Sequence, residues 1–350
     1  MPTVISWPSI ELLPNVIKTL SHLASLTPEE GGRPLPVLTF RAKTKLHGTN
    51  CAVQITPTGD SGPVVTQSRT TILTPDGGDL HGFSKWVHAR GLGNSAGDHL
   101  SYFRFLQPGI TVFGEWCGPG VEAGMAVSDL AEKQFCVFGI QVGTSTDARI
   151  VYDPYEIEGY THGSSGYPPK NLHVLPYLEG VEVKIDFSDP QSLAAAAEYL
   201  NGVVARVEKE DPWVKKTFGV SGLGEGIVLY PVSGSLVPND PENLAHYLFK
   251  AKGLKHRTAG TREAVQVAPE VVHGVAEFVD LMVTEARLSQ GLATVCPEGL
   301  RDPKLTGKFL LWVGTDVQKE SALELEASGL TWDLVVKAVQ VRAREWYLRK

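Results

Sequence analysis

The sequence predicts an α+β fold in which an antiparallel-rich system of strands is followed by a helical region. Two textures carry this prediction. From Val37 to about Tyr230, short apolar and β-branched runs alternate with turns rich in Gly, Pro, Asp and Ser, which is typical of strands. After Arg262 the apolar residues recur at the spacing of helices instead. Strands followed by helices indicate the α+β class.

The first elements can be located along the chain by their patterns. A helical pattern covers residues 9–26, and Pro14 is expected to start or split that helix because proline disrupts a helix interior. A further helix is expected over residues 189–200. Strands are expected in the apolar runs at residues 37–40, 53–55, 62–66, 110–113, 135–142, 149–152 and 226–230.

The C-terminal region carries two apolar stripes at helical spacing. The first consists of Val271, Val275, Phe278, Val279, Met282 and Ala286. The second follows Thr331, the expected N-cap, and consists of Val335, Val339, Ala343 and Trp346. The basic residues of this last stretch either contact phosphates or form a solvated helix face; they are Lys337, Arg342, Arg344, Arg349 and Lys350. A boundary near Gly260 divides the chain into domains 1–258 and 259–350.

Composition limits the class of protein. The chain has 350 residues, of which 42% are hydrophobic and 20% charged, as is usual for a globular protein with a large core. The net charge of −7 gives no sign of a uniformly basic nucleic-acid-binding protein. It does not exclude nucleic acid, because a local basic patch is sufficient for binding.

The four cysteines, Cys51, Cys117, Cys136 and Cys296, fit no metal-binding spacing. The N-terminus lacks the basic and apolar regions of a secretory signal, and no apolar run reaches the ~18 residues that a membrane span needs. We therefore expect reduced thiols and an intracellular protein of the cytoplasm or nucleus, without a membrane partner.

The segment from Lys45 to Asn50, Lys-Leu-His-Gly-Thr-Asn, follows an apolar strand. Gly48 lets the backbone turn sharply and approach a ligand closely. A lysine at such a place can present its amine to a phosphate, and lysine is also a covalent nucleophile. Taken alone, the segment is weak evidence, and a surface turn is the simpler interpretation.

Three downstream residues are further candidates. Arg69 follows a strand and is either a phosphate ligand or a solvated arginine. Glu115 ends an apolar strand before a Gly-Pro-Gly turn, where a carboxylate needs a partner such as a ribose hydroxyl, a metal-bound water or a structural salt bridge. Phe138 lies in an apolar run and either packs in the core or presents its ring to a nucleobase.

The last candidates are Glu225, which lies between two glycines at the start of a strand, and the pair Lys250 and Lys252. Period-2 alternation puts both lysines on one face of a strand. Two such cations repel each other unless an anion lies near them, and a nucleotide phosphate is an anion of that kind. The alternative is an edge strand with a solvated basic face.

Taken in order, these segments resemble the covalent nucleotidyltransferase superfamily of DNA ligases, RNA ligases and mRNA capping enzymes, and in particular the RNA ligase 2 family. The first motif of that family is similar to residues 45–50; its later motifs are similar to residues 113–120, 135–138, 225–228 and 250–252. The resemblance implies an antiparallel-rich, ATP-grasp-like nucleotidyltransferase domain followed by a small all-α C-terminal domain. Three positions depart from the family's pattern: Thr44 and Tyr230, where an acidic and a basic residue are common, and Gly139, where an aspartate is common.

The resemblance implies an ATP-dependent RNA ligase that joins 3′-OH and 5′-phosphate RNA ends at nicks in duplex RNA, with RNA as partner and with ATP and Mg²⁺ or Mn²⁺ as cofactors. It makes Lys45 the residue that carries AMP, and it assigns the metal to Glu225, the ribose to Glu115 and adenine to Phe138. It assigns the α-phosphate to Lys250 and Lys252. It assigns phosphates or the RNA end to Arg69, His47 and Asn50, and it places Gly48 in the nucleotide site.

Three other readings stay open at this stage. An mRNA capping guanylyltransferase and an ATP-dependent DNA ligase share the superfamily's motifs, but they usually carry an OB-fold after the fifth motif, where this chain is helical. A nucleic-acid-binding relic without catalysis is the third, and the retained charged residues of the motifs disfavour it.

Overall fold

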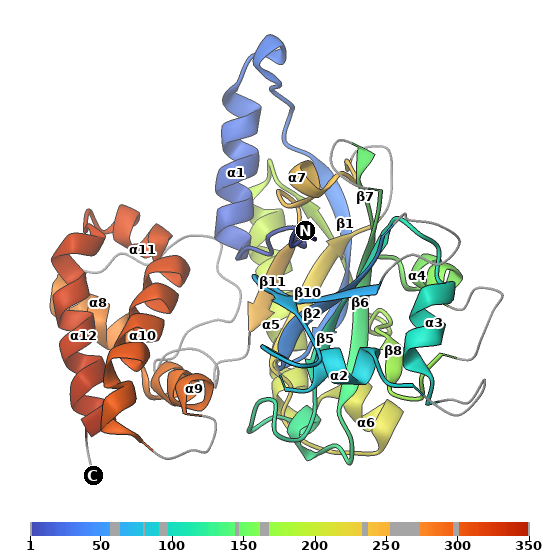
Figure 1. Ribbon diagram of the computed structural model, residues 1–350. Coiled ribbons are helices and arrows are strands. Elements are labelled where there is room, and N and C mark those ends of the chain that lie inside the picture. The colour runs from blue at the N-terminus through green and yellow to red at the C-terminus, as the bar shows by residue number, and fades with distance from the viewer. Residues whose placement is uncertain are drawn as a thin grey trace. The chain divides into compact units, whose positions relative to one another are not determined.

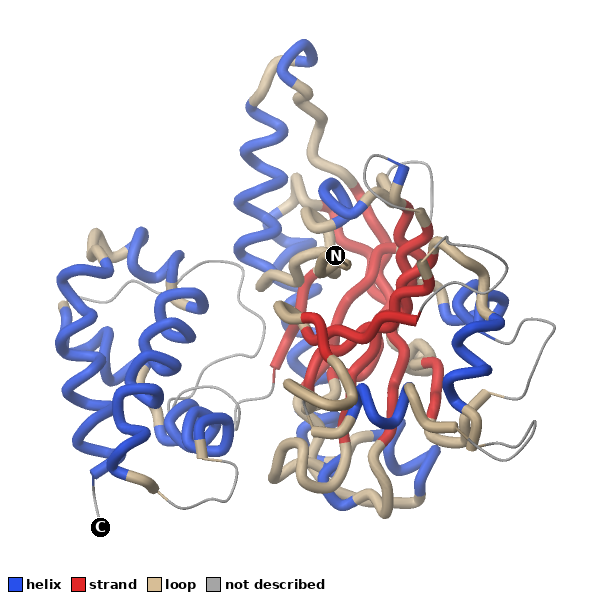
Figure 2. Tube along the Cα trace, viewed as in Figure 1, coloured by secondary structure: helices blue, strands red, loops and turns tan. Residues whose placement is uncertain are grey.

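The region that contains the predicted motifs folds into two β-sheets (Figure 1). The computed structural model of the protein describes residues 2–56, 64–79, 81–90, 97–143, 147–161, 168–232, 237–252, 274–296 and 301–348. Strands occupy the region between residues 37 and 252, whereas the described residues from 274 onward form helices and turns (Figure 2). The predicted mixture of helices and antiparallel sheet is confirmed.

The smaller sheet has the strand order β11-β10-β1-β9. It consists of β1 (Val37–Lys45), β9 (Glu182–Asp186), β10 (Gly226–Pro231) and β11 (Phe249–Lys252). The strands predicted at 37–40 and 226–230 are confirmed, and β1 continues to Lys45. β1 and β10 are antiparallel with Lys45 opposite Gly226, so the end of β1 lies beside the start of β10.

The larger sheet has the strand order β4-β3-β2-β5-β6-β7, with β8 parallel to β6. Its strands are β2 (Thr49–Ile55), β3 (Val64–Ser68), β4 (Ile72–Leu73), β5 (Ile110–Cys117), β6 (Gln134–Val142), β7 (Arg149–Val151) and β8 (Leu172–Val174). The neighbours from β2 to β7 are antiparallel, as the sequence predicts.

A β-bulge interrupts the pairing of β5 with β6. Phe113 lies opposite Gly139 and Gly114 opposite Val137, which leaves Phe138 as the extra residue. Val137 and Ile140 pack in the same hydrophobic cluster, so the two residues between them lie on the opposite side of the strand. A bulge re-aims side chains in this way, and bulges are common beside active sites.

The two faces of the larger sheet have different cores. On one face, Phe135 and other strand residues pack against the helices α2 (Phe83–Val87), α3 (His99–Phe105) and α4 (Pro154–Thr161). On the other face, Phe113 and Phe138 belong to a cluster that includes Trp213 and Val214 of α6 (Pro212–Phe218). This second face carries the candidate site.

Contacts divide the chain into two compact units. The first comprises residues 1–11, 36–185 and 210–250, and includes α7 (Pro241–Leu244). The second comprises residues 12–35, 186–209 and 251–350, and includes α1 (Leu13–Ser25) and α5 (Pro190–Lys209). Pro14 lies in the first turn of α1, so it starts this helix rather than splitting it. The domain boundary predicted between residues 258 and 259 lies outside the described residues.

The C-terminal helices are α8 (Val275–Met282), α9 (Glu285–Val295), α10 (Thr306–Glu320), α11 (Ala322–Ala327) and α12 (Trp332–Leu348). The stripe on α12 is confirmed, since Val335, Val339, Ala343 and Trp346 are all buried. The prediction that the first stripe, from Val271 to Ala286, lies on one helix is wrong. Its residues 275–282 lie in α8 and residue 286 in α9, because Thr284 adopts the extended conformation that β-branched N-cap residues favour. Val271, Arg349 and Lys350 lie outside the described residues.

Among the described residues, no helix combines the length and the apolar character that a bilayer crossing requires.

Candidate active site

Lys45 forms an ion pair with Glu225 at the point where β1 ends and β10 begins. Its Nζ lies 2.7 Å from Oε2 of Glu225. The Glu225 side chain is 4% exposed and that of Lys45 24%. A carboxylate buried to this degree needs a partner, and the amine at the end of β1 supplies it. Lys45 is therefore held in place, yet it can be reached from solvent.

His47 lies between two carboxylates. Its Nδ1 is 3.6 Å from Oε2 of Glu225, and its Nε2 is 3.7 Å from Oε2 of Glu122. Burial raises the pKa of the Glu122 carboxyl; His47 opposes this effect and Glu225 adds to it. The turn before β2 is tight here, because a Cβ at Gly48 would lie 2.5 Å from the carbonyl oxygen of Trp116. Only glycine fits this close approach of two strands.

Glu115 belongs to the same group of charges. It lies on β5 opposite Asn50 of β2. Burial raises the pKa of Glu115 from 4.5 to about 7. Charged neighbours act on this pKa in both directions: Lys45 and His47 lower it, whereas Glu225 and Glu122 raise it. A carboxyl group with a pKa near neutrality can accept or donate a hydrogen bond, which suits it to a hydroxyl group.

Phe138, the extra residue of the bulge, has its backbone fixed by Lys43. The Lys43 Nζ donates a 3.0 Å hydrogen bond to the Phe138 carbonyl oxygen. Lys43 is only 1% exposed, and its Nζ lies 5.1 Å from the ring centre of Tyr230 and 5.5 Å from that of Tyr177. Burial lowers its pKa to about 7. Of the two lysines at the end of β1, only Lys45 is thus accessible to a ligand.

Thr44, between these lysines, points away from both and contacts Asp211. Its Oγ1 donates a 2.9 Å hydrogen bond to Oδ2 of Asp211. The other oxygen of Asp211 accepts from the backbone N–H groups of Trp213 and Val214 at 3.0 Å and so caps α6. The end of β1 is in this way anchored to the start of a helix.

The remaining predicted residues lie on elements around this cluster. Lys250 and Lys252 are partly buried and alternate with the buried Phe249 and Ala251, which confirms the predicted common face. Their strand, β11, is next but one to β1 in the sheet. Arg69 is exposed at the turn that joins β3 to β4.

Comparison with known families decides the relationship. The sequence model of the RNA ligase family matches residues 38–252, which is more than half of the chain and includes every residue of the cluster. The chain belongs to the RNA ligase family. No curated protein matches its sequence.

Solved structures of RNA ligases are similar to this chain at low identity. A Naegleria gruberi RNA ligase with PPi is 16% identical, covers 72% of this chain and 57% of its own, and has a TM-score of 0.40. A mutant of that ligase with ATP and Mn has the same identity and coverage and a TM-score of 0.39. An archaeal ATP-dependent RNA ligase is 12% identical, covers 97% of this chain and 65% of its own, and has a TM-score of 0.39. The chain thus spans less than two thirds of each of these ligases.

Among the predicted residues of this RNA ligase family member, the structure brings together Lys45, His47, Glu115 and Glu225. Asn50 lies beside them, opposite Glu115. Arg69 is not joined to this cluster by any contact of the described residues. No group of three or more His, Cys, Asp and Glu side chains converges on a metal site in the part of the chain that the structure describes.

Sequence reasoning missed four residues that shape the site: Lys43, Glu122, Asp211 and Trp7. Glu122 closely follows the Gly-Pro-Gly turn after Glu115, and this nearness was a signal that could have found it. Asp211 is far from β1 in sequence, and only the tertiary fold pairs it with Thr44. Trp7 precedes the matched region altogether.

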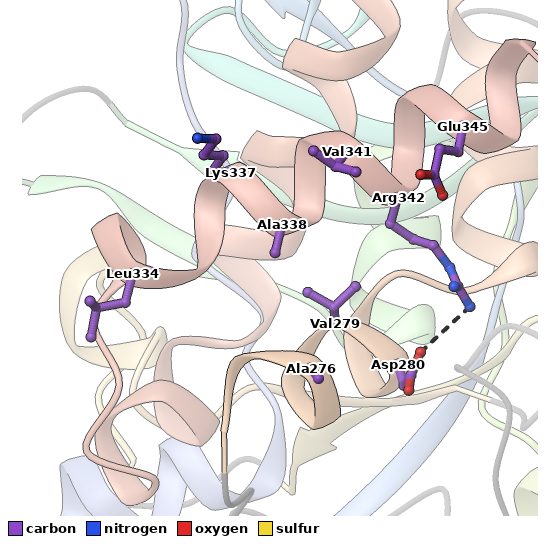
Figure 3. A pocket seen from close by; sticks show the side chains of 9 residues that line it. All are labelled: Ala276, Val279, Asp280, Leu334, Lys337, Ala338, Val341, Arg342 and Glu345. Atoms are coloured by element: carbon purple, nitrogen blue, oxygen red, sulfur yellow. Dashed lines mark ion pairs between the residues drawn. The ribbon is translucent and has the colours of Figure 1, made fainter.

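The C-terminal helices α8 and α12 form a groove of about 550 Å³ (Figure 3). Its rim carries both signs of charge, and Arg342 Nη2 lies 3.5 Å from Oδ1 of Asp280. Lys337 and Glu345 also line it. Because these charges offset one another, the groove does not favour phosphate binding by the basic C-terminal stretch. It leaves the alternative of a solvated helix face open.

Proposed function

We propose that the protein is an ATP-dependent RNA ligase that joins 3′-OH and 5′-phosphate RNA ends. The observation that carries this proposal is the accessible Lys45 amine, held 2.7 Å from a buried carboxylate within the RNA ligase match. An ammonium fixed beside buried carboxylates is positioned to meet a phosphate once a proton is lost. DNA ligases and capping enzymes of the superfamily use the same amine. The experiments below therefore test which nucleotide and which nucleic acid the protein uses.

The proposed first step is attack of the Lys45 Nζ on the α-phosphorus of ATP. An N–P bond forms, the bond to the β-phosphate oxygen breaks, and pyrophosphate leaves with its electron pair. The amine must lose a proton, and the Glu225 carboxylate, 2.7 Å away, can accept it. This step leaves AMP on Lys45.

In the second step an oxygen of the RNA 5′-phosphate attacks the same phosphorus, and the Lys45 N–P bond breaks. In the third, the 3′-OH attacks the RNA phosphorus, its proton is lost, and AMP leaves. Positioning and neutralisation of charge are the main contributions of a protein to phosphoryl transfer.

The remaining roles are proposals on the same basis. Glu115 holds the ribose hydroxyls, Phe138 stacks on adenine, and Lys250 and Lys252 neutralise the α-phosphate. The three residues assigned to phosphates or the RNA end are His47, Asn50 and Arg69. Glu225 would hold Mg²⁺ or Mn²⁺, directly or through water, and a metal ion there neutralises phosphate charge.

The finer architecture and substrate complete the proposal. We infer an ATP-grasp-like nucleotidyltransferase domain over residues 1–258 and an all-α domain over 259–350 that helps to engage nucleic acid. The preferred substrate is a nick in duplex RNA, because the family resemblance lies with RNA ligase 2.

Radiolabelled nucleotide tests the reaction. The wild-type protein is incubated with ATP or GTP labelled in the α-phosphate and run on a denaturing gel. We expect label from ATP, and none in Lys45→Ala or Lys45→Arg. Lys184→Met is the control, since Lys184 is exposed on β9, the strand beside β1, and it should keep the label. Label from GTP alone would assign a capping activity, and no label would remove the proposal.

Sealing assays then test the substrate. Nicked duplexes carry RNA or DNA on each side of the break, and unpaired RNA strands serve as comparison. We expect sealing when RNA supplies the 3′-OH end of a nick. Equal sealing of all-DNA nicks would contradict the assignment as an RNA ligase.

A further inference from the structure

The N-terminal segment from Thr3 to Glu11 contacts both sheets and the bulge at Phe138, and it precedes the region that the family match covers. Its first part is bound to the larger sheet by two buried glutamines. Ile5 donates its backbone N–H to Oε1 of Gln67 at 3.0 Å and accepts from Nε2 of Gln67 at 2.8 Å. Gln54 of β2 donates to the carbonyl oxygen of Thr3 at 2.8 Å. These bonds fix the path of the segment as a strand partner would.

The other end of the segment is bound to the smaller sheet. The backbone N–H of Glu11 donates to the carbonyl oxygen of Leu248 at 3.1 Å, and that of Lys250 donates to the carbonyl oxygen of Glu11 at 2.8 Å. The segment therefore runs from the strands that precede Arg69 to the strand that carries Lys250. Both ends are held, so the residue in the middle has a defined position.

That middle residue is Trp7, and its indole contacts the bulge that carries Phe138. Its ring centre lies 5.1 Å from that of Phe138, in an edge-to-face arrangement, and 5.2 Å from that of Phe113. A Cβ at Gly139 would lie only 1.9 Å from Cη2 of Trp7. The bulge and the missing side chain at position 139 together make room for the indole.

Two properties of Trp7 point to a ligand. Phe138 is 8% exposed and so is nearly covered, whereas Trp7 beside it is only partly buried, so the indole is the more accessible of the two rings. In addition, the buried Nε1 of Trp7 has no hydrogen-bond partner among the described residues. Folded proteins rarely leave such a donor unpaired, and a ring nitrogen of a purine would accept from it.

We propose that Trp7 is a base-contacting, specificity-determining residue that forms the nucleobase site together with Phe138. This inference rests on the proposed function, because it places the purine of ATP against the indole. Aromatic side chains bind bases through their faces, and the indole N–H adds a directional contact that distinguishes bases. Gly139 is the residue that permits Trp7 to take this place.

The test is single-turnover labelling of Lys45 at a series of ATP concentrations with Trp7→Phe and Trp7→Leu. Trp7→Leu removes the aromatic face and should raise the half-saturating ATP concentration by roughly 5- to 150-fold, the range that loss of one base–aromatic stack produces. Trp7→Phe keeps a face and loses the N–H, so the rise should be about 2- to 12-fold, as for one hydrogen bond. The labelling rate at saturating ATP should change little, because the contact is made before the reaction.

Ile5→Ala is the matched control, since Ile5 lies in the same segment and packs in the same cluster without a ring contact to Phe138. It should keep the wild-type ATP dependence. An equal rise in Ile5→Ala and Trp7→Leu would assign the effect to packing of the segment and overturn the proposal. A Trp7→Leu variant that labels at wild-type or lower ATP concentration would also overturn it, because the indole would then be neutral or cover the site.

Gly139 supplies an independent variant should Trp7→Leu fold poorly, which circular dichroism would reveal. Gly139→Ala drives a Cβ into the indole and should raise the half-saturating ATP concentration, whereas Gly139→Ala combined with Trp7→Phe or Trp7→Leu should add little to the Trp7 change alone. Additive effects would show that the two positions do not act as one and would count against the proposal. If the wild-type protein takes no label from ATP, the proposed function itself is wrong. If the wild-type protein is labelled and Trp7→Leu has the same half-saturating ATP concentration, only the inference about Trp7 is wrong.

Discussion

The hydroxyl of Thr44 donates a 2.9 Å hydrogen bond to Asp211, a carboxylate that is 2% exposed. Thr44 directly precedes Lys45, at a position where the resemblance to the RNA ligase 2 family predicts an acidic residue. The buried carboxylate beside this position comes instead from the start of α6. Burial raises the pKa of Asp211, although its hydrogen bonds with Val214, Thr44 and Trp213 oppose the rise. The departure at position 44 is therefore part of a paired arrangement.

Thr44→Val should destabilise the protein. The substitution keeps the shape of the side chain but leaves Oδ2 of Asp211 without this donor, and an unsatisfied buried acceptor costs about 1–3 kcal/mol. The loss should be larger at pH 8 than at pH 4, because the hydroxyl stabilises the ionised carboxylate. Urea unfolding at both pH values measures it. Thr39→Val on the same strand is the control, and an equal loss there would assign the effect to the strand rather than to Asp211.

Glu225→Gln should abolish labelling of Lys45 by ATP, whereas Glu122→Gln should reduce it only partly. Glu225 contacts both Lys45 and His47, whereas Glu122 contacts His47. Loss of a charged group that acts on the reacting atoms typically lowers the rate by about 10²- to 10⁴-fold. Single-turnover labelling measures both rates. Equal effects of the two substitutions would contradict the central place given to Glu225.

Glu115→Gln should change how stability depends on pH. Burial raises the pKa of this carboxyl from 4.5 to about 7 in the folded protein, so the folded state binds the proton more tightly than the unfolded state. Its contribution to stability is full below pH 4.5 and is lost as the pH rises through 7. The variant, which cannot ionise, should gain in melting temperature relative to wild type between pH 5 and pH 8. A difference that stays constant over this range would refute the raised pKa.

Local signals predicted the strands and drew attention to Lys45, Glu115 and Glu225, whereas only the resemblance to a known family predicted that these three residues form one site. Apolar alternation marks a strand, and a polar residue at a strand end is visible as an interruption. The bulge at Phe138 was invisible, since it depends on how β5 and β6 register and not on either strand alone. The same holds for Trp7, whose contact with Gly139 spans the chain from its first residues to β6.

The break between α8 and α9 was missed for a different reason. The apolar spacing continues from Val275 across the break to residue 286, so periodicity alone predicts one helix. Thr284 ends that helix by taking the extended N-cap conformation of the next one. A β-branched residue in a helical pattern was the available signal, and it competes weakly with periodicity.

Lys43→Met should raise the melting temperature most at low pH. The ammonium of Lys43 is buried at 1% exposure between two tyrosine rings, and burial lowers its pKa from 10.5 to about 7. The folded state thus binds this proton less tightly than the unfolded state does. The resulting penalty on stability is full below pH 7 and is relieved as the pH rises from 7 toward 10.5. Methionine fills a similar volume without a charge, so its advantage over lysine should shrink between pH 6 and pH 10.

Arg41→Met is the control for this comparison. Arg41 lies two residues before Lys43 on the same strand, and its guanidinium stacks on Tyr177, 4.2 Å from the ring centre. Its loss removes a cation from the same tyrosine but no fully buried ammonium, so the change in melting temperature should be independent of pH. Parallel pH profiles for Lys43→Met and Arg41→Met would mean that Lys43 is not buried as an ammonium. The expected result is a higher melting temperature at pH 6 for Lys43→Met and not for Arg41→Met. This result would mean that the wild-type protein keeps the hydrogen bond from Lys43 to the Phe138 carbonyl at a cost in stability.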